Sequence, residues 1–201
     1  MENTIQNLEV KIVSMSPMIQ HNDQLADPLN EWTKLIKEIT KKRSKKNEED
    51  LIKLMEYEFK GGLYMAKNGD GAEHVVIPQH VIDATITNGA KKLRQGRLAQ
   101  IAVWANKHSA LEYDGPKTMN ELWDAGTFRD VRGVVVRRAR IMRCRPIFKE
   151  WAATLCLSYD SSQTNKSQVI EWVELAGLYA GFCEMRPKFG RFALKEQVTT
   201  S

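Results

Sequence analysis

Residues 129–149, RDVRGVVVRRARIMRCRPIFK, combine the valine and isoleucine content of a β-strand with seven arginines, one lysine and a single acid, Asp130. Arginine is always charged, and its planar fork of donors suits phosphate. An unpaired charge is costly to bury, so such a strand must meet solvent or an anion. We therefore expect nucleic acid as the partner. The alternative is that the arginines point into solvent or pair with the chain's own carboxylates.

The positive charge of the chain is concentrated in a few segments. The 201 residues carry a formal net charge of +5. Four segments hold at least three Lys or Arg and at most one acid each: residues 34–46, 91–97, 129–149 and 186–191. If these segments converge in space, they form a surface that attracts a polyanion.

Composition sets the broad class of protein. A hydrophobic content of 42 % over 201 residues is typical of a single globular domain, residues 1–201. Cys144, Cys156 and Cys183 share no C-x-x-C spacing, so we expect reduced thiols, no metal site and no cofactor. We find no signal-peptide pattern and no apolar stretch of membrane-spanning length. These features predict a cytoplasmic protein with no membrane partner, in the host cytoplasm if the protein is viral.

Local patterns predict an α+β fold. The expected helices cover residues 29–40, 47–59, 79–95, 118–125 and 167–180, with Asn47 as an N-cap and Thr118 with Glu121 as a capping box. The expected strands cover residues 8–14, 63–66, 74–77, 99–105, 110–113, 131–143, 150–159 and 191–195. The order βαββαβ predicts a ferredoxin-like antiparallel sheet with helices on one face. Its core is assigned to residues 7–17, 79–95 and 131–196, and residues 18–78 and 96–130 to a helical and hairpin insertion.

Alternation along the strand at residues 131–143 sets the direction of its arginines. Arg138 and Arg140 share one face, and Arg137 and Arg143 share the other. With helices on one side of the sheet, Arg138 and Arg140 would lie on its open face, where sheets of the RNA-recognition type bind single strands. The alternative is ion pairing with one of three acids: Glu150, Glu171 or Glu174.

The remaining basic segments supply further candidates. The lysine cluster at a helix end is either a solvated connection or a contact to the nucleic-acid backbone. Phe189 stands in a short glycine-interrupted basic segment and is a candidate for stacking on a base. The predicted nucleic-acid-binding residues are Lys41, Lys42, Arg43, Lys45, Lys46, Arg138, Arg140, Arg143, Arg186, Phe189 and Arg191.

Signals for catalysis are few. His21 with Asp23 and Asp27 is the single acid–base cluster in the sequence, and a loop histidine beside aspartates is more often a turn feature. The sequence has no glycine-rich phosphate loop, nucleophile elbow or metal-binding helix pattern. We therefore expect a protein that is not an enzyme. A ribonuclease built on His21 is the alternative.

Two short motifs resemble a known superfamily. Gly177, Gly181 and the run from Arg186 to Phe192 follow a predicted helix and lead into a predicted strand, and Ser16-Pro17-Met18 follows the first strand. These motifs are similar to the glycine-rich loop and the first turn of the repeat-associated (RAMP) superfamily, whose ferredoxin-like RNA-binding members include backbone subunits of CRISPR effector complexes. Cys183 stands where the family pattern has a second glycine.

The whole chain is also similar to phage-encoded proteins of about this length that carry five short motifs. Here those motifs are His21-Asn22, residues 26–28, 113–116, 145–148 and 186–192. These resemblances imply a non-catalytic subunit that binds single-stranded RNA or DNA through phosphate neutralisation and stacking. Homo-oligomers assembled head-to-tail along the strand are one form of this function. Two alternatives stay open: a phage protein that binds a host protein and inhibits a nucleic-acid-directed defence complex, and a virion assembly protein.

Overall fold

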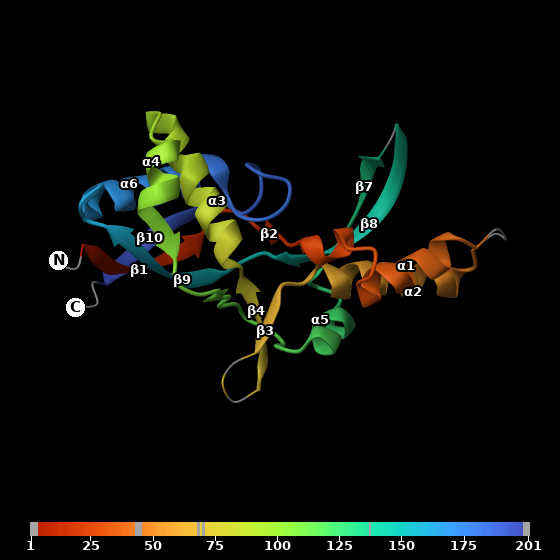
Figure 1. Cartoon of the computed structure of the whole chain (residues 1–201). Helices are drawn as coiled ribbons and strands as arrows, with labels where there is room; N and C mark the ends of the chain where they lie inside the picture. Colours follow the sequence, from red (N-terminus) through yellow and green to blue (C-terminus); the bar gives the residue numbers. More distant parts are fainter. Residues whose placement is uncertain (1–3, 43–45, 68, 70, 137, 199–201) are drawn as a thin grey trace.

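A computed structural model of the chain describes residues 4–42, 46–67, 69, 71–136 and 138–198, and the α+β class predicted from the sequence is confirmed (Figure 1). The strands are β1 Ile5–Ser14, β2 Met18–Ile19, β3 Met65–Lys67, β4 Glu73–Ile77, β5 Val103–Ala105, β6 Ser109–Ala110, β7 Arg129–Val136, β8 Ala139–Phe148, β9 Ala152–Asp160 and β10 Phe192–Val198. The helices are α1 Glu31–Thr40, α2 Glu48–Gly62, α3 Gln79–Ala90, α4 Gly96–Ala102, α5 Met119–Ala125 and α6 Lys166–Leu175. Short 3-10 turns η1 Asp23–Ala26 and η2 Lys91–Leu93 and the π-turn η3 Ala176–Ala180 complete the described elements.

The main sheet has four antiparallel strands in the order β10-β1-β9-β5. Along β1, Leu8, Val10 and Ile12 are fully buried, whereas the residues between them are not. This alternation gives the sheet one apolar face and one polar face. Elements of this sheet and the helices packed on it follow one another along the chain as β1, α3, β5, β9, α6 and β10.

Helices α3 and α6 lie side by side on the apolar face of this sheet (Figure 1). Ile82 and Ile86 of α3 and Val169 and Val173 of α6 belong to the same buried cluster as Leu8 and its neighbours on the sheet. Burying branched apolar side chains from both layers is the main stabilising contribution expected here. The core therefore lies between one face of the sheet and this helix layer.

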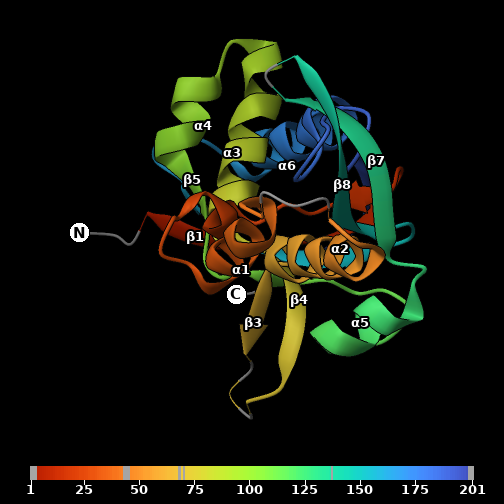
Figure 2. The same ribbon diagram turned by 90° about the vertical axis from the view of Figure 1, so that its right-hand side faces the viewer.

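The arginine-rich segment does not belong to the main sheet, so its predicted position there was wrong. Residues 131–143 were expected to form one strand, but β7 and β8 form a hairpin that turns between Val136 and Ala139, and β8 then pairs with β2. Arg138 takes the left-handed backbone conformation that this turn needs, with φ of 68°. The hairpin projects above α1 and α2, away from the main sheet (Figure 2).

The edge of the main sheet is formed instead by β5, from a region that was predicted to be an insertion. Residues 99–105 were expected to be a strand, but residues 99–102 belong to helix α4 and strand pairing begins at Val103.

The capping residues at the starts of two helices were predicted correctly. The Asn47 side chain accepts a hydrogen bond from the Asp50 amide at 2.8 Å, and Thr118 caps α5 through the Glu121 amide.

The short strand β2 joins the hairpin to the rest of the molecule. Next to it, Gln20 is completely buried and forms hydrogen bonds in three directions. Its amide donates to the Pro146 carbonyl at 3.0 Å, and its side-chain NH₂ donates to the Val76 carbonyl at 3.0 Å. Its side-chain oxygen accepts from the Tyr64 amide at 2.9 Å. One residue therefore ties β8, β4 and the start of β3 together.

Within the described part of the chain, no helix combines the length and the apolar character needed to cross a lipid bilayer.

We predict that Gln20→Leu lowers the free energy of unfolding by about 2–4 kcal/mol, because a buried carbonyl and an amide lose their partners. Urea unfolding monitored by circular dichroism measures this change. The exposed Gln163→Leu serves as the matched control and should change the stability by less than about 0.5 kcal/mol. Equal effects of the two substitutions would contradict a structural role for Gln20.

Candidate nucleic-acid interface

The arginines of the hairpin divide between its two faces. Arg132 lies opposite Arg143 across the ladder, and Asp130 lies opposite Arg145, so these side chains share one face. Arg138 and Arg140 are exposed at the tip. The hypothesis that they lie on the open face of the main sheet was wrong, because the hairpin stands apart from that sheet.

Arg143 is held by an acid that was not among the predicted partners. Its guanidinium forms an ion pair with Glu58 of α2, a residue whose side chain is only 7 % exposed. The other oxygen of the same carboxylate accepts a hydrogen bond from the Cys144 amide at 3.0 Å. Glu58 therefore fixes both the side chain and the backbone of β8. Arg143, predicted as a phosphate ligand, is first of all a structural contact.

Arg132 connects the hairpin to the segment after η3, residues 181–191, which we call the C-terminal loop. Its guanidinium pairs with Asp130 and lies over the ring of Phe189, 4.8 Å from the centroid. It also donates a hydrogen bond to the sulfur of Met185 at 3.4 Å. One face of the predicted stacking residue Phe189 is thus covered by an arginine of the hairpin.

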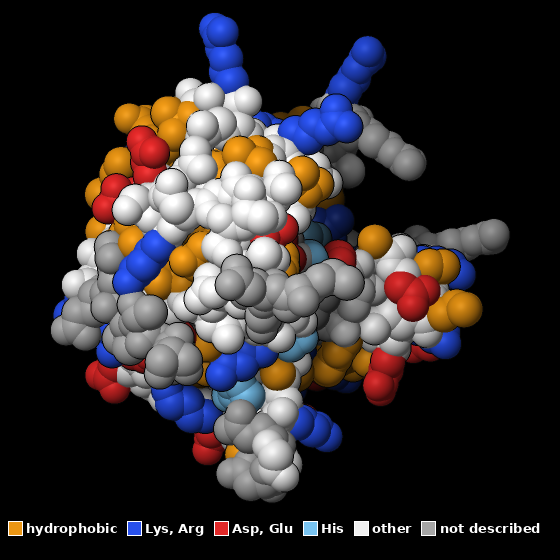
Figure 3. All heavy atoms as spheres, turned by 60° about the vertical axis from the view of Figure 1, so that its left-hand side comes forward, with side chains coloured by type: hydrophobic (Ala, Val, Ile, Leu, Met, Phe, Trp, Pro, Cys, Tyr) orange, Lys and Arg blue, Asp and Glu red, His pale blue; other side chains and the backbone are white. Residues whose placement is uncertain are grey.

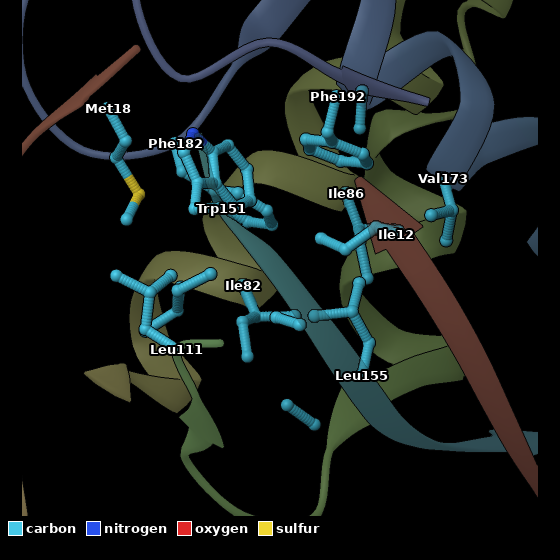
Figure 4. Packing of buried hydrophobic residues seen from close by; sticks show 14 of the residues in the cluster. Ile12, Met18, Ile82, Ile86, Leu111, Trp151, Leu155, Val173, Phe182 and Phe192 are labelled. Atoms are coloured by element: carbon cyan, nitrogen blue, oxygen red, sulfur yellow. The ribbon is translucent and has the colours of Figure 1, made fainter. Parts of the chain in front are cut away.

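The C-terminal loop is folded tightly on the main sheet. The Phe182 amide donates to the Gly190 carbonyl at 2.9 Å, which brings the two ends of the loop together. A Cβ atom on Gly190 would lie 2.1 Å from the Phe182 carbonyl oxygen, so a side chain cannot be accommodated there. Beneath the loop, the rings of Phe182 and Phe192 stack at 4.6 Å, and Trp151 meets both edge-on (Figure 4). The glycines of this motif serve packing of the loop on its own backbone.

A cavity of about 410 Å³, which we call the hairpin groove, lies between the hairpin, α1 and α2. Figure 3 shows the surface hollowed between the body of the molecule and the lobe formed by α1 and α2. Four of the lining side chains can carry positive charge: His21, Lys37, Arg143 and Arg145. Glu58, the acid in the lining, is paired with Arg143. The hairpin groove is therefore positively charged overall.

Two groups at the hairpin groove have buried nitrogens without a partner among the described residues. These atoms are His21 Nδ1 and Arg145 Nε. Burial and the nearby Arg145 lower the pKa of His21. The imidazole of the free protein is therefore neutral at pH 7. An anion in the hairpin groove would lie beside the guanidinium of Arg145 and a histidine that can take up a proton.

The other predicted site residues have different positions. Lys41 and Lys42 lie just after α1, where Lys42 pairs with Asp50, and Lys46 precedes α2. Arg43 and Lys45 lie outside the described residues. Arg186 is exposed in the C-terminal loop beside Pro187. Arg191 ends that loop, and its amide donates to the Ser16 hydroxyl at 3.0 Å.

The structure therefore brings two of the four basic segments together in the lining of the hairpin groove, residues 34–46 and 129–149, and a third, residues 186–191, lies in the C-terminal loop that Arg132 contacts. Arg132, Arg145 and Lys37 were not predicted as site residues. All three had a signal in the sequence, because they lie inside segments of high positive charge. The role of Glu58 had none, because it depends on a contact between residues 85 positions apart.

The acid–base cluster predicted around His21 does not form as a unit. Asp23 is 3.9 Å from His80, whereas the groups that act electrostatically on His21 are Arg145, Glu184, Arg143 and Glu58. Among the described residues, His, Cys, Asp and Glu side chains form no group of three that could hold a metal ion. The arrangement is suited to binding an anion by charge and hydrogen bonds.

Comparison with protein-family models and with curated protein sequences finds no match to this chain.

We predict that Glu58→Ala lowers the free energy of unfolding by about 3 kcal/mol, since it leaves a guanidinium and a buried amide without their acceptor. The double variant Glu58→Leu, Arg143→Met should recover most of this loss, because it removes both charges. Urea unfolding measures both changes. Glu49→Ala, an exposed position on the same helix, is the control, and a loss there as large as at Glu58 would contradict the assignment.

Proposed function

We propose that this protein binds single-stranded nucleic acid in the hairpin groove and along the C-terminal loop, without catalysing a reaction on it. The observation that carries this proposal is the basic lining of the hairpin groove, to which residues 34–46 contribute Lys37 and residues 129–149 contribute Arg143 and Arg145. Arg132 connects the hairpin to the C-terminal loop by its contacts with Met185 and Phe189. A concave surface with several cations in one place favours a flexible polyanion over a small ligand.

The order of the main sheet supports the finer fold assignment. The strands β1, β5, β9 and β10 alternate with α3 and α6 in the chain order βαββαβ, and β1 and β9 lie at the centre of the sheet. This arrangement favours a ferredoxin-like core of the RAMP type, with the projecting hairpin as an addition. Resemblance of fold does not itself assign a function, so the proposal rests on the site.

The cations divide into those that hold the protein together and those that remain for a ligand. Arg132 and Arg143 have carboxylate partners within the protein. Arg138, Arg140 and Arg186 are exposed and form no ion pair with the described residues. These three, together with Arg145, are the groups we assign to phosphate. Binding of this kind has weak sequence preference and depends steeply on salt.

The test is fluorescence anisotropy with labelled single-stranded RNA and DNA of about thirty nucleotides, titrated at several salt concentrations. We expect saturable binding, and we expect Arg138→Glu with Arg140→Glu to weaken it by about ten-fold or more at low salt. The slope of log affinity against log salt should decrease by about 1.4, because two phosphate contacts are lost.

Lys107→Glu with Lys195→Glu is the control of equal charge, since both lysines are exposed on other surfaces. If this control weakens binding as much as the hairpin variant does, the interaction is a general effect of net charge. If the unmodified protein does not bind either oligonucleotide at low salt, the proposed function is wrong.

Binding should also depend on pH through His21. Its lowered pKa keeps the imidazole neutral at pH 7, and a nearby phosphate favours the protonated form. Binding then takes up a proton, so the affinity should rise as the pH falls from 7.5 to 5.5. His21→Gln should abolish this dependence while the protein remains folded by circular dichroism. If the affinity of His21→Gln depends on pH as that of the unmodified protein does, His21 is not the group that takes up the proton on binding.

A second candidate function, binding of a protein, is favoured by the outer face of the hairpin. Val131, Val135 and Met142 are 48 %, 70 % and 59 % exposed, and they share this face with the basic tip. Exposed apolar side chains on a projecting hairpin are typical of a protein contact. The partner would be another copy of the chain, in a head-to-tail assembly, or a host protein. Sedimentation velocity with and without nucleic acid distinguishes self-assembly from binding of a single copy.

A further inference from the structure

A second basic groove runs between α3 and α4, on a different side of the C-terminal loop from the hairpin. We call it the helix groove. It has a volume of about 800 Å³ and is lined by residues of α3, η2, α4 and strand β5, among them His80, Asp83, Asn88, Lys91, Arg97 and Trp104. None of the site residues predicted from the sequence lies in it.

The charge in and beside the helix groove is strongly positive. Lys91, Lys92, Arg94 and Arg97 are all exposed, and in the part of the chain that the structure describes none of them pairs with a carboxylate. The acid in the lining is Asp83. Its carboxylate already accepts the Ala105 amide at 2.7 Å, so its oxygen is committed to holding β5. These four cations therefore remain available for an anion.

Trp104 belongs to the lining of the helix groove and lies on the edge strand β5. Val103 and Ala105 on either side of it are buried, so alternation along β5 turns the indole away from the core and toward solvent. Its exposed fraction is 36 %, whereas Trp123, Trp151 and Trp172 are all less than 10 % exposed. A partly exposed indole beside several cations is the combination that binds single strands by stacking and phosphate contacts.

At its upper end, the helix groove borders the C-terminal loop. Asn88 lines both the helix groove and a small pocket formed with Tyr179, Ala180, Arg186 and Pro187. Lys92 lies 5.1 Å from the centre of the Tyr179 ring in the same region. Arg186 follows Met185, the residue that accepts a hydrogen bond from Arg132 of the hairpin.

At the lower end of the helix groove, Tyr64 links His80 to His21 of the hairpin groove. His80 packs edge-on against Tyr64 at 6.2 Å, and the Tyr64 hydroxyl donates to the His21 carbonyl at 3.2 Å. Figure 1 shows the C-terminal loop lying between α3 and the hairpin. Contacting residues thus link the helix groove to the C-terminal loop at one end and to His21 of the hairpin groove at the other.

We propose that the helix groove is a second segment of the nucleic-acid path, in which Lys91 and Arg97 bind phosphates and Trp104 stacks on a base. This inference rests on the proposed function, because it extends the same strand beyond the C-terminal loop. An acidic peptide could satisfy the cations, but it would not use the exposed indole for stacking. A single-stranded nucleic acid uses both kinds of group.

The experiment compares oligonucleotides of two lengths, about ten and about thirty nucleotides, by anisotropy at one salt concentration. The unmodified protein should bind the longer strand more tightly. Lys91→Glu with Arg97→Glu should weaken binding of the longer strand by about ten-fold and change binding of the shorter strand by less than about two-fold. Trp104→Ala should also reduce the ratio of the affinity for the longer strand to the affinity for the shorter strand. The salt dependence of binding should change little, since stacking is not ionic.

Arg138→Glu with Arg140→Glu is the complementary variant and should weaken binding of both lengths. Lys107→Glu with Lys195→Glu again controls for net charge, and thermal unfolding confirms that each variant is folded. If the helix-groove variants bind both lengths as the unmodified protein does, the extension is wrong and the proposed function stands. If these variants bind both lengths equally weakly, the helix groove is not a separate segment of the nucleic-acid path. The proposal is also wrong if polyglutamate displaces the longer strand as well as unlabelled oligonucleotide does. Failure of the unmodified protein to bind either length refutes the proposed function itself.

Discussion

The buried hydrogen bonds of Gln20 hold the parts of this molecule in register. Its amide and side chain reach the root of the hairpin, β4 and the start of β3. The neighbouring Pro17 and Ile19 carbonyls accept the amides of Gly190 and Glu184 in the C-terminal loop. A buried amide side chain is costly unless every partner is satisfied, so this arrangement tolerates little displacement. The position of the hairpin relative to the C-terminal loop, and hence the shape of the proposed site, depends on this short segment.

Arginine has two roles in the hairpin. Near its root, Arg129 lies 3.9 Å from the Trp123 ring, Arg132 covers Phe189 and Arg143 pairs with Glu58. Each of these contacts fixes the hairpin to another element. At the tip, Arg138 and Arg140 remain exposed. A planar, weakly hydrated cation suits both tasks, since it can stack and pair inside the protein and still bind phosphate outside it. The density of arginine in this segment is therefore explained only in part by a ligand.

Helices and strands that are marked by local sequence signals could be predicted, whereas the elements that they pair with or pack against could not. Asn47 and Thr118 mark helix starts because capping is a contact over three residues. The turn at Arg138 was missed because branched apolar residues and arginine occur on both sides of it, with no Gly, Pro or Asn to mark the turn. Membership of a sheet is a long-range property, so β5 could not be distinguished from an insertion. The basic segments that contribute to the candidate site could be recognised in the sequence. The pairing of the buried Glu58 with Arg143 and the contact of Arg132 with Phe189 could not, because they depend on the tertiary structure.

The hairpin is held at its base and exposed at its tip. The base is fixed by strand pairing with β2, by the Glu58 carboxylate and by the packing of Arg129 on Trp123. The tip carries Arg138 and Arg140 into solvent. A two-stranded ribbon has little rigidity of its own compared with a sheet packed on helices. Beyond the contacts of Arg132 and Arg143, small rotations of the two strands are magnified toward the tip, so Arg138 and Arg140 can change position at low energetic cost while the base keeps its place. In the proposed complex, the tip arginines can then adjust to ligands of different bulk without a change in the shape of the hairpin groove.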